Sequence, residues 1–189
     1  MVDVMKILED TGAVMNGHFL LTSGLHSPRY VEKFRLLQYP DHTAPLCDMV
    51  ADHFKGIEIH SVAGPTLGGV ILAYEVARAL KVRSIYAERE GDSRVFRRGL
   101  SLNPGEKVLV VDDILTTGGS VKEVVEAVRA EGAIPAAVGV LVDRSGGQVR
   151  FEVPFFSCLQ LAIPAYRTEA CPQCAQGVPL IKPGGAPDR

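Results

Sequence analysis

Apolar residues occur in two patterns that alternate along most of the chain. Short runs in which nearly every residue is apolar predict strands buried on both faces, and stretches with apolar residues every three or four positions predict helices. Such an alternation is typical of a mainly parallel sheet flanked by helices, so the sequence predicts an α/β fold. Strands are expected at 57–63, 84–87, 107–111, 136–142 and around Phe155-Phe156, and helices at about 44–55, 67–80 and 121–131.

The beginning of the chain and one internal stretch depart from this pattern. A short helix is expected at 5–13, and the alternating residues 18–34, interrupted at Ser23-Gly24, predict a β-hairpin. Residues 88–106 are polar and rich in arginine and glycine, which indicates either a long loop or an exposed hairpin.

Size, charge and cysteine content argue against several classes of protein. The 189 residues fit one domain, and the net charge of −2 argues against nucleic-acid binding. No apolar run reaches the roughly 18 residues that a membrane span requires. The N-terminus does not resemble a secretory signal, so the four cysteines are interpreted as reduced thiols of a cytoplasmic protein.

Polar residues that directly follow predicted strands are the first candidates for a binding site. Ligands of open parallel sheets bind at the carboxyl ends of the strands. Gly64, the pair Asp112-Asp113 and the pair Asp143-Arg144 each follow a predicted strand. We therefore expect these residues to meet at one edge of the sheet.

The segment VLVVDDILTTGGS at 108–120 carries the clearest chemistry. A buried strand ends in two carboxylates, and a turn rich in threonine and glycine leads directly into a helix. Glycines allow the backbone to approach a ligand, and the N–H groups at a helix start bind anions, so the turn suits a phosphate. The carboxylates suit a neighbouring diol or a bound cation instead. Adjacent strand residues face opposite sides, so Asp112 and Asp113 are expected to differ in role.

This segment resembles the phosphoribosyl pyrophosphate (PRPP) motif of the type I phosphoribosyltransferases. The Walker A and G-x-G-x-x-G patterns of other phosphate-binding proteins are absent from the sequence. The resemblance implies a type I phosphoribosyltransferase-like fold and a PRPP-dependent enzyme, in which Mg²⁺ is carried by PRPP without direct protein ligands. The residues expected to bind PRPP are Asp112, Asp113, Ile114, Leu115, Thr116, Thr117, Gly118, Gly119, Ser120, Arg89, Arg94, Arg97, Gly64 and Pro65.

Four further segments resemble the orotate phosphoribosyltransferases within that family. The hairpin at 18–34 is similar to one that covers the base, and residues 63–65 with 68–69 are similar to a loop that contacts pyrophosphate. Residues 87–89 with 97–99 are similar to a mobile catalytic loop. Residues 142–144 correspond to the place where the family has an arginine against orotate. The resemblance implies transfer of phosphoribosyl from PRPP to orotate, giving orotidine 5′-phosphate and pyrophosphate in pyrimidine (UMP) biosynthesis.

Arg144 fits this activity because the carboxylate of orotate needs a cation with a fork of donors. Its alternative role is a surface salt bridge with Asp143 or another acid. Orotate is expected to contact Thr116, Arg144, Ser23 and Arg29, although Arg29 fits a solvated hairpin arginine equally well. The catalytic residues are expected to be Asp112, Asp113 and Arg89.

The resemblance also implies how the chain is organised. Residues 1–189 are expected to form one phosphoribosyltransferase domain, with a core at about 41–165 and a small hood made of about 1–40 plus the C-terminal segment. Thr22 and Gly68 occupy positions at which the family often has lysine. Contacts made through those lysines are therefore not expected in this chain.

The arginines of 88–106 suggest how the leaving group is stabilised. Arg89, Arg94, Arg97 and Arg98 could stabilise the charge that grows on pyrophosphate, and closure of the loop would exclude water. The resemblance implies that this loop reaches into the active site of a partner subunit, and hence a homodimer with shared active sites. The alternative is an ordinary solvated loop, in which acids such as Glu90 balance the arginines.

Other interpretations stay open at this point. A phosphoribosyltransferase for another base, such as a purine or uracil, would not require Arg144. A non-catalytic regulator could sense PRPP with the same motif. The pair Cys171 and Cys174 forms a single CxxC, whereas a zinc site needs four ligands, so zinc binding and plain thiols are both possible.

Overall fold

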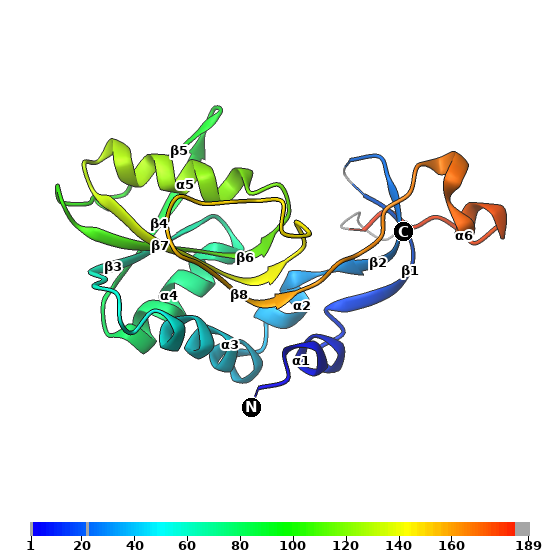
Figure 1. The fold of residues 1–189 in the computed structure, drawn as a ribbon, viewed down its shortest axis with the longest axis horizontal. Helices are drawn as coiled ribbons and strands as arrows, with labels where there is room; N and C mark the ends of the chain where they lie inside the picture. Colours follow the sequence, from blue (N-terminus) through cyan, green and yellow to red (C-terminus); the bar gives the residue numbers. More distant parts are fainter. Residues whose placement is uncertain (1, 22, 184–189) are drawn as a thin grey trace.

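A six-stranded sheet forms the centre of the molecule (Figure 1). The structure is a computed structural model and describes residues 2–21 and 23–183. The strand order is β5-β4-β3-β6-β7-β8, and all neighbours are parallel except β4 and β5. The predicted mainly parallel sheet is therefore confirmed. The strands are β3 (Ser61–Pro65), β4 (Arg83–Glu90), β5 (Ser93–Phe96), β6 (Lys107–Leu115), β7 (Ile134–Asp143) and β8 (Phe155–Gln160).

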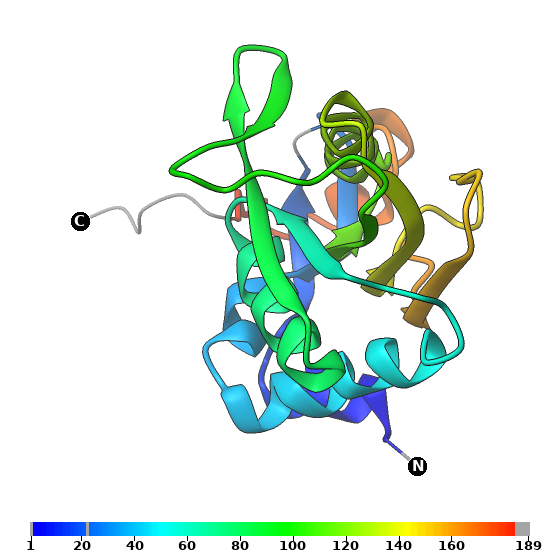
Figure 2. The ribbon, with the colours of Figure 1, turned by 90° about the vertical axis from the view of Figure 1, so that its left-hand side faces the viewer.

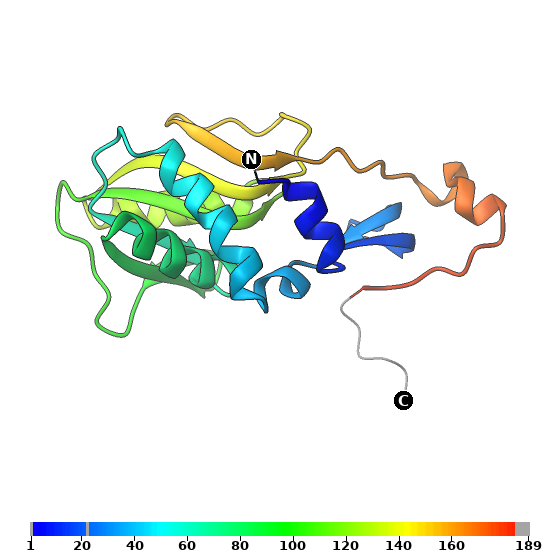
Figure 3. The ribbon, with the colours of Figure 1, turned by 90° about the horizontal axis from the view of Figure 1, so that it is seen from below.

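Helices cover both faces of this sheet (Figures 1 and 3). The helices α3 (Pro40–His53) and α4 (Gly68–Leu80) cover one face, and α5 (Gly119–Ala130) covers the other. Side chains of β6 alternate between the two cores: Leu109 packs with α3 and α4, whereas Val110 packs with α5. This alternation decides where the polar residues at the end of β6 point.

The N-terminal part and the C-terminal segment (residues 161–183) lie together beside the sheet (Figure 1). The hairpin contains the antiparallel strands β1 (Val14–Leu20) and β2 (His26–Val31), as predicted. Main-chain bridges join β1 to Ile181 and β2 to Tyr166. The helices of these two regions are α1 (Val4–Asp10), α2 (Lys33–Leu37), the 3-10 helix η1 (Thr168–Ala170) and α6 (Pro172–Ala175).

The arginine-rich stretch after β4 forms an exposed hairpin, one of the two predicted alternatives. Strands β4 and β5 pair around a turn at Gly91-Asp92, and the hairpin rises away from the sheet in the upper part of Figure 2. No helix of the described residues is both long and apolar enough to cross a membrane.

Several predicted boundaries are wrong for physical reasons. The third strand begins at Ser61 and not at residue 57, because Ile57 and Ile59 pack against the core without joining the sheet. Strand β6 continues through the two aspartates to Leu115, because its hydrogen-bonded ladder with β7 extends that far. Helix α2 was not predicted, since the expected hairpin included its first residues.

Candidate active site

The ends of β3, β6 and β7 meet at one edge of the sheet, as predicted. The Arg144 N–H, just after β7, donates to the carbonyl of Leu115 at the end of β6, over 2.8 Å. Gly68, which follows β3, lies directly against the carboxylate of Asp113. Residues from three separate strand ends therefore form one candidate site.

The two aspartates of β6 are buried and face opposite sides of the sheet. Asp112 is 6% exposed and Asp113 is 4% exposed. The Asp112 carboxylate accepts the N–H of Asp113 over 2.9 Å, and the Asp113 carboxylate accepts the N–H of Ile114 over 2.7 Å. Each aspartate thus supports the backbone of the turn through one of its carboxylate oxygens.

Burial raises the pKa of both carboxyl groups. The pKa of Asp112 rises to about 7, first because of burial and then because of the neighbouring charge of Asp113. The pKa of Asp113 is also raised by burial, but Lys33 opposes this rise. The Lys33 ammonium donates to Oδ1 of Asp113 over 3.2 Å and lies 2.9 Å from Oδ2. Sequence reasoning missed Lys33, because only the tertiary fold brings α2 to the end of β6.

The carboxylate of Asp113 fills the space that a side chain at position 68 would occupy. A Cβ atom at this position would lie 1.6 Å from Oδ2 of Asp113. Any side chain there would displace the carboxylate from its contact with Lys33. In this structure the glycine therefore allows the Asp113 carboxylate to pack directly against the start of α4.

The turn at 116–120 is shaped as an anion site. Gly118 has a φ of +78°, which favours glycine, and it lies at the N-cap of α5. No side chain of the described residues caps this helix start. Its N–H groups and the exposed Thr116 and Thr117 can therefore donate to a phosphate.

Arg144 provides a cation beside this turn. Its side chain is half-buried, and burial lowers the pKa of the guanidinium, whereas the charge of nearby Tyr30 opposes that change. The Nε atom is buried and has no hydrogen-bond partner among the described residues. The ion pairs found in the described part of the chain do not include Arg144, so the alternative salt bridge with Asp143 is not formed. Tyr30 was not predicted, although it lies in the hairpin motif.

Of the expected hairpin contacts, Ser23 lies in the turn between β1 and β2, and Arg29 lies on β2. Ser23 and Arg29 are exposed, and Thr22 lies outside the described residues. Ser27 is buried and its hydroxyl donates to the carbonyls of Arg29 and Pro164 over 2.8 and 3.0 Å. Ser27 thus joins the hairpin to the C-terminal segment, whereas Ser23 and Arg29 are left free to meet a ligand.

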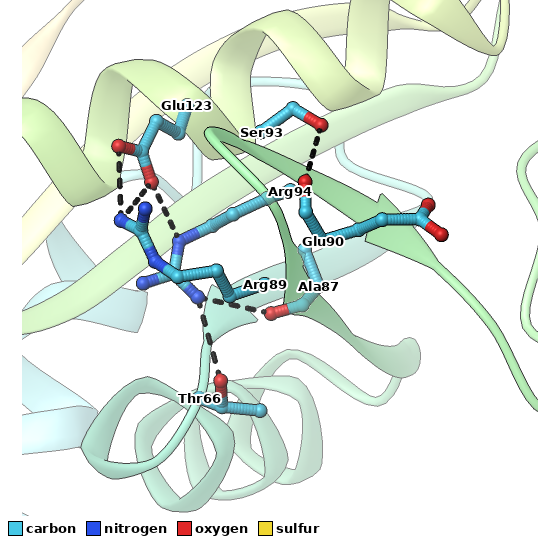
Figure 4. A network of polar contacts seen from close by, with 7 residues as sticks. All are labelled: Thr66, Ala87, Arg89, Glu90, Ser93, Arg94 and Glu123. Atoms are coloured by element: carbon cyan, nitrogen blue, oxygen red, sulfur yellow. Dashed lines mark hydrogen bonds and ion pairs between the residues drawn. The ribbon is translucent and has the colours of Figure 1, made fainter.

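Two arginines of the β4–β5 hairpin pair with one acid of α5 (Figure 4). Arg89 and Arg94 both contact the carboxylate of Glu123 on α5, at 2.9 and 3.1 Å. Arg94 is only 8% exposed and also donates to the carbonyl of Ala87 over 3.3 Å. Sequence reasoning did not identify Glu123, which lies in an ordinary amphipathic helix.

The remaining two arginines of this hairpin are more exposed. Arg97 pairs with Glu90, and Arg98 pairs with Glu88 over 2.7 Å. Acids of the stretch itself therefore pair with these two arginines, as the alternative interpretation expected, whereas Arg89 and Arg94 pair with Glu123 of α5. Arg89, Arg97 and Arg98 are at the surface, where a ligand or another chain could compete for them.

Known proteins share both the sequence and the fold. The model of the phosphoribosyl transferase domain matches residues 47–166. An orotate phosphoribosyltransferase of Thermotoga maritima is 51% identical over 181 residues, which are 96% of this chain and 97% of that protein. One of Pelotomaculum thermopropionicum is 50% identical over 182 residues, 96% of each chain. The chain belongs to the orotate phosphoribosyltransferase family. The crystal structure of an orotate phosphoribosyltransferase from Aeropyrum pernix superposes with a TM-score of 0.69 at 29% identity, covering 84% of this chain and 94% of that one.

Membership of the family confirms the predicted fold class and the kind of enzyme. The matched domain contains Asp112, Asp113, the turn at 116–120 and Arg144. The hairpin lies outside this domain match but within the 96% of the chain that aligns with the orotate phosphoribosyltransferases. The resemblance to the phosphoribosyltransferases and, within them, to the orotate phosphoribosyltransferases is therefore confirmed.

Proposed function

We propose that this chain transfers phosphoribosyl from PRPP to N1 of orotate, giving orotidine 5′-phosphate and pyrophosphate in pyrimidine biosynthesis. The observation that carries the choice of base is the half-buried guanidinium of Arg144, which has no acidic partner among the described residues. A buried cation without a partner is costly unless a ligand supplies the missing charge. The carboxylate of orotate is such a ligand, whereas purines and uracil carry no comparable anion.

The PRPP donor fits the end of β6 and the start of α5. We assign the 5′-phosphate to Thr116, Thr117, Gly118, Gly119 and Ser120, whose N–H and hydroxyl groups surround the helix start. The ribose hydroxyls are assigned to Asp112 and Asp113, with Ile114 and Leu115 between the two parts. Gly64 and Pro65, at the end of β3, are assigned to pyrophosphate. Positioning of this kind is the main contribution that a protein can make to such a transfer.

Orotate is placed between this donor site and the hairpin. Arg144 would hold the carboxylate, and Thr116 would lie at the junction of base and ribose. Ser23 and Arg29 are proposed as contacts from the hairpin, which their exposure permits. In this arrangement the hairpin and the C-terminal segment form the hood, and about 41–165 form the core of a single domain.

The donor is proposed to carry Mg²⁺ into the site. The residues present fit this ion, because the carboxylates of the consecutive residues Asp112 and Asp113 are both buried at this strand end. Magnesium usually keeps several waters and is held by phosphates and one or two carboxylates. It would supply charge neutralisation of pyrophosphate, with the two aspartates as the nearest protein groups.

The arginines of the β4–β5 hairpin are proposed to act on pyrophosphate. Arg89, Arg94 and Arg97 would stabilise its charge more strongly in the transition state than in the ground state. When the hairpin closes, the Arg89 guanidinium would leave the Glu123 carboxylate and bind a phosphate oxygen of pyrophosphate. Arg94 is the most deeply buried of the three, so its role would include holding the hairpin on α5.

A homodimer with shared active sites is part of the proposal. Leu67, Ile71 and Tyr74, at and after the start of α4, are exposed apolar residues. Ile71 and Tyr74 line a hollow of 360 Å³, together with Leu37 and Pro40. An apolar face of this kind next to the candidate site is suited to a second copy of the chain. A cytoplasmic location is also proposed, which four cysteines without disulfides support.

Replacement of Arg144 tests the choice of base. We expect Arg144→Ala to lower kcat/KM for orotate by roughly 10² or more, because it removes a charge-assisted pair in a half-buried site. Binding of PRPP, measured by calorimetry, should stay within about twofold. Arg150→Ala, at an exposed position six residues further along the chain, is the matched control and should behave like the wild type. An Arg144→Ala protein that uses orotate normally would show that another residue binds the base.

A further inference from the structure

Four side chains that the proposed reaction does not use converge between the hairpin and the C-terminal segment. His18 lies on β1, His26 lies on β2, Cys171 is the N-cap of α6 and Cys174 lies within α6. One ring nitrogen of each histidine and the two sulfur atoms all lie within 4.8 Å of one another. We propose that these four residues bind a structural zinc ion.

The distances between these atoms are close to those around a tetrahedral zinc ion. His18 Nε2 lies 2.9 Å from His26 Nδ1, 3.4 Å from Cys171 Sγ and 3.6 Å from Cys174 Sγ, and His26 Nδ1 lies 3.2 Å from Cys174 Sγ. Zinc bonds of about 2.0–2.1 Å to nitrogen and about 2.3 Å to sulfur separate the ligands of a tetrahedron by roughly 3.3–3.8 Å. Small movements of the side chains would therefore complete the site.

The surroundings of His18 fix the ring in the form that binds a metal. Its Nδ1 atom lies 2.8 Å from the carbonyl of Val178. A carbonyl only accepts hydrogen bonds, so Nδ1 carries the proton and Nε2 of the neutral ring directs its lone pair toward His26 and the two cysteines. Histidines that bind metals commonly donate their second N–H to a carbonyl in this way.

Burial and ligand type indicate zinc and a structural role. His18, His26 and Cys171 are 2%, 5% and 3% exposed, so three of the four ligands are shielded from water. Thiolates are soft ligands and imidazoles suit zinc, so this set of ligands favours zinc over Mg²⁺. A zinc ion with four protein ligands has no open position for a substrate, so this site would not take part in the transfer reaction.

The zinc ion would join the C-terminal segment to the hairpin. Beyond Ile163, no described residue belongs to either hydrophobic core cluster. The contacts that hold this segment are mainly polar: the Leu20 N–H donates to the carbonyl of Ile181 over 2.9 Å, and the His26 N–H donates to that of Tyr166 over 2.8 Å. A two-stranded hairpin is marginally stable by itself. A zinc ion bound by residues of both strands and of α6 would fix the hood as one unit.

Metal analysis of the untagged protein, purified without chelators from zinc-containing medium, tests this proposal. We expect about one zinc ion per chain in the wild type and in Cys158→Ala, which changes a cysteine of β8 that is outside the cluster and donates a hydrogen bond to the Leu46 carbonyl. The double variant Cys171→Ser, Cys174→Ser should retain less than about a tenth of that zinc. Hydrogen exchange of 164–183 should become faster in the double variant.

Cobalt substitution of the wild type keeps the test decisive if the double variant does not fold. Co²⁺ bound by two thiolates and two imidazoles should give thiolate charge-transfer absorption and the strong visible bands of tetrahedral geometry. A wild-type protein without zinc, whose Co²⁺ spectrum is that of the hydrated ion, would overturn the proposal. In that case His26 Nδ1–H would donate to His18 Nε2, and the cluster would be a network of hydrogen bonds.

Discussion

The ammonium of Lys33 lies 2.9 Å from the carboxylate of Asp113, although the two residues are 80 positions apart in the sequence. Lys33 begins the short helix α2, and Asp113 lies near the end of the central strand β6. Its ammonium group thus contacts one member of the buried pair Asp112-Asp113. It therefore opposes the effect of burial on the pKa of the carboxylate that we assign to the ribose of PRPP.

Replacement of Lys33 should make the aspartates harder to ionise. In Lys33→Met the pKa of Asp113 should rise further, because the cation that opposes the effect of burial is lost. If the ionised form is needed, the acidic limb of the plot of kcat/KM against pH should move to higher pH, and the maximum should fall by roughly tenfold or more. Lys6→Met, on the exposed surface of α1, is the control. An unchanged acidic limb in Lys33→Met would exclude this role.

Asp112 should make stability depend on pH. Its pKa of about 7 in the folded protein lies above the ordinary value of 3.8, so the folded state binds the proton more tightly than the unfolded chain. The stabilising contribution of Asp112 to the free energy of unfolding is therefore fully present below about pH 4 and is lost as the pH rises toward about 7.

Asp112→Asn removes this penalty. Relative to the wild type, its free energy of unfolding should increase by on the order of 2 kcal/mol between about pH 4 and pH 8. Denaturant unfolding at both pH values measures this difference, while kcat should fall by about 10² because the ribose contact is lost. Asp41→Asn, at an exposed position, should show little pH-dependent difference. An equal effect of both substitutions would contradict the burial of charge at Asp112.

Glu123 should be important for stability, unlike the exposed ion pairs of the same hairpin. Glu123→Gln leaves the buried Arg94 without its carboxylate, and we expect a loss of roughly 2–4 kcal/mol in the free energy of unfolding. Arg98→Ala breaks a pair in which the arginine is 69% exposed, so little change is expected. Chemical denaturation of both variants compares these effects, and similar stabilities would mean that the Arg94 contact is not formed.

Mixing two inactive variants tests the shared active site. One protein carries Asp112→Asn and Asp113→Asn, and the other carries Arg89→Ala. If Arg89 acts in the partner subunit, a hybrid dimer contains one intact site and should recover part of the wild-type activity. Native mass spectrometry would establish that mixed dimers form. Mixed dimers without activity would show that each hairpin serves its own subunit.

The parts of the site that are local in sequence could be predicted, and those that depend on tertiary contacts could not. The motif at 108–120 places carboxylates, glycines and hydroxyls within one strand–turn–helix unit, so their arrangement follows from local geometry. The strand ends at Gly64 and Arg144 could be assigned to the same edge because parallel strands share that edge.

Lys33 and Glu123 were missed for a physical reason. Each lies in an ordinary helix, and nothing in the residues around it shows that it faces the site. The histidine–cysteine cluster could not be predicted for the same reason. His26 and Cys174 are 148 positions apart, and they meet only because the C-terminal segment packs against the hairpin. The end of β6 was misplaced because aspartates are uncommon in strands, and only the ladder with β7 keeps Asp112 and Asp113 in the sheet.

The most direct test of the proposed reaction is an absorbance assay with PRPP and Mg²⁺ in which orotate, uracil, hypoxanthine and guanine are offered in parallel. We expect Mg²⁺-dependent consumption of orotate and none of the other three bases. Consumption of a different base would contradict the assignment of Arg144 to the carboxylate of orotate. Binding of PRPP without turnover of any base would contradict the catalytic role itself.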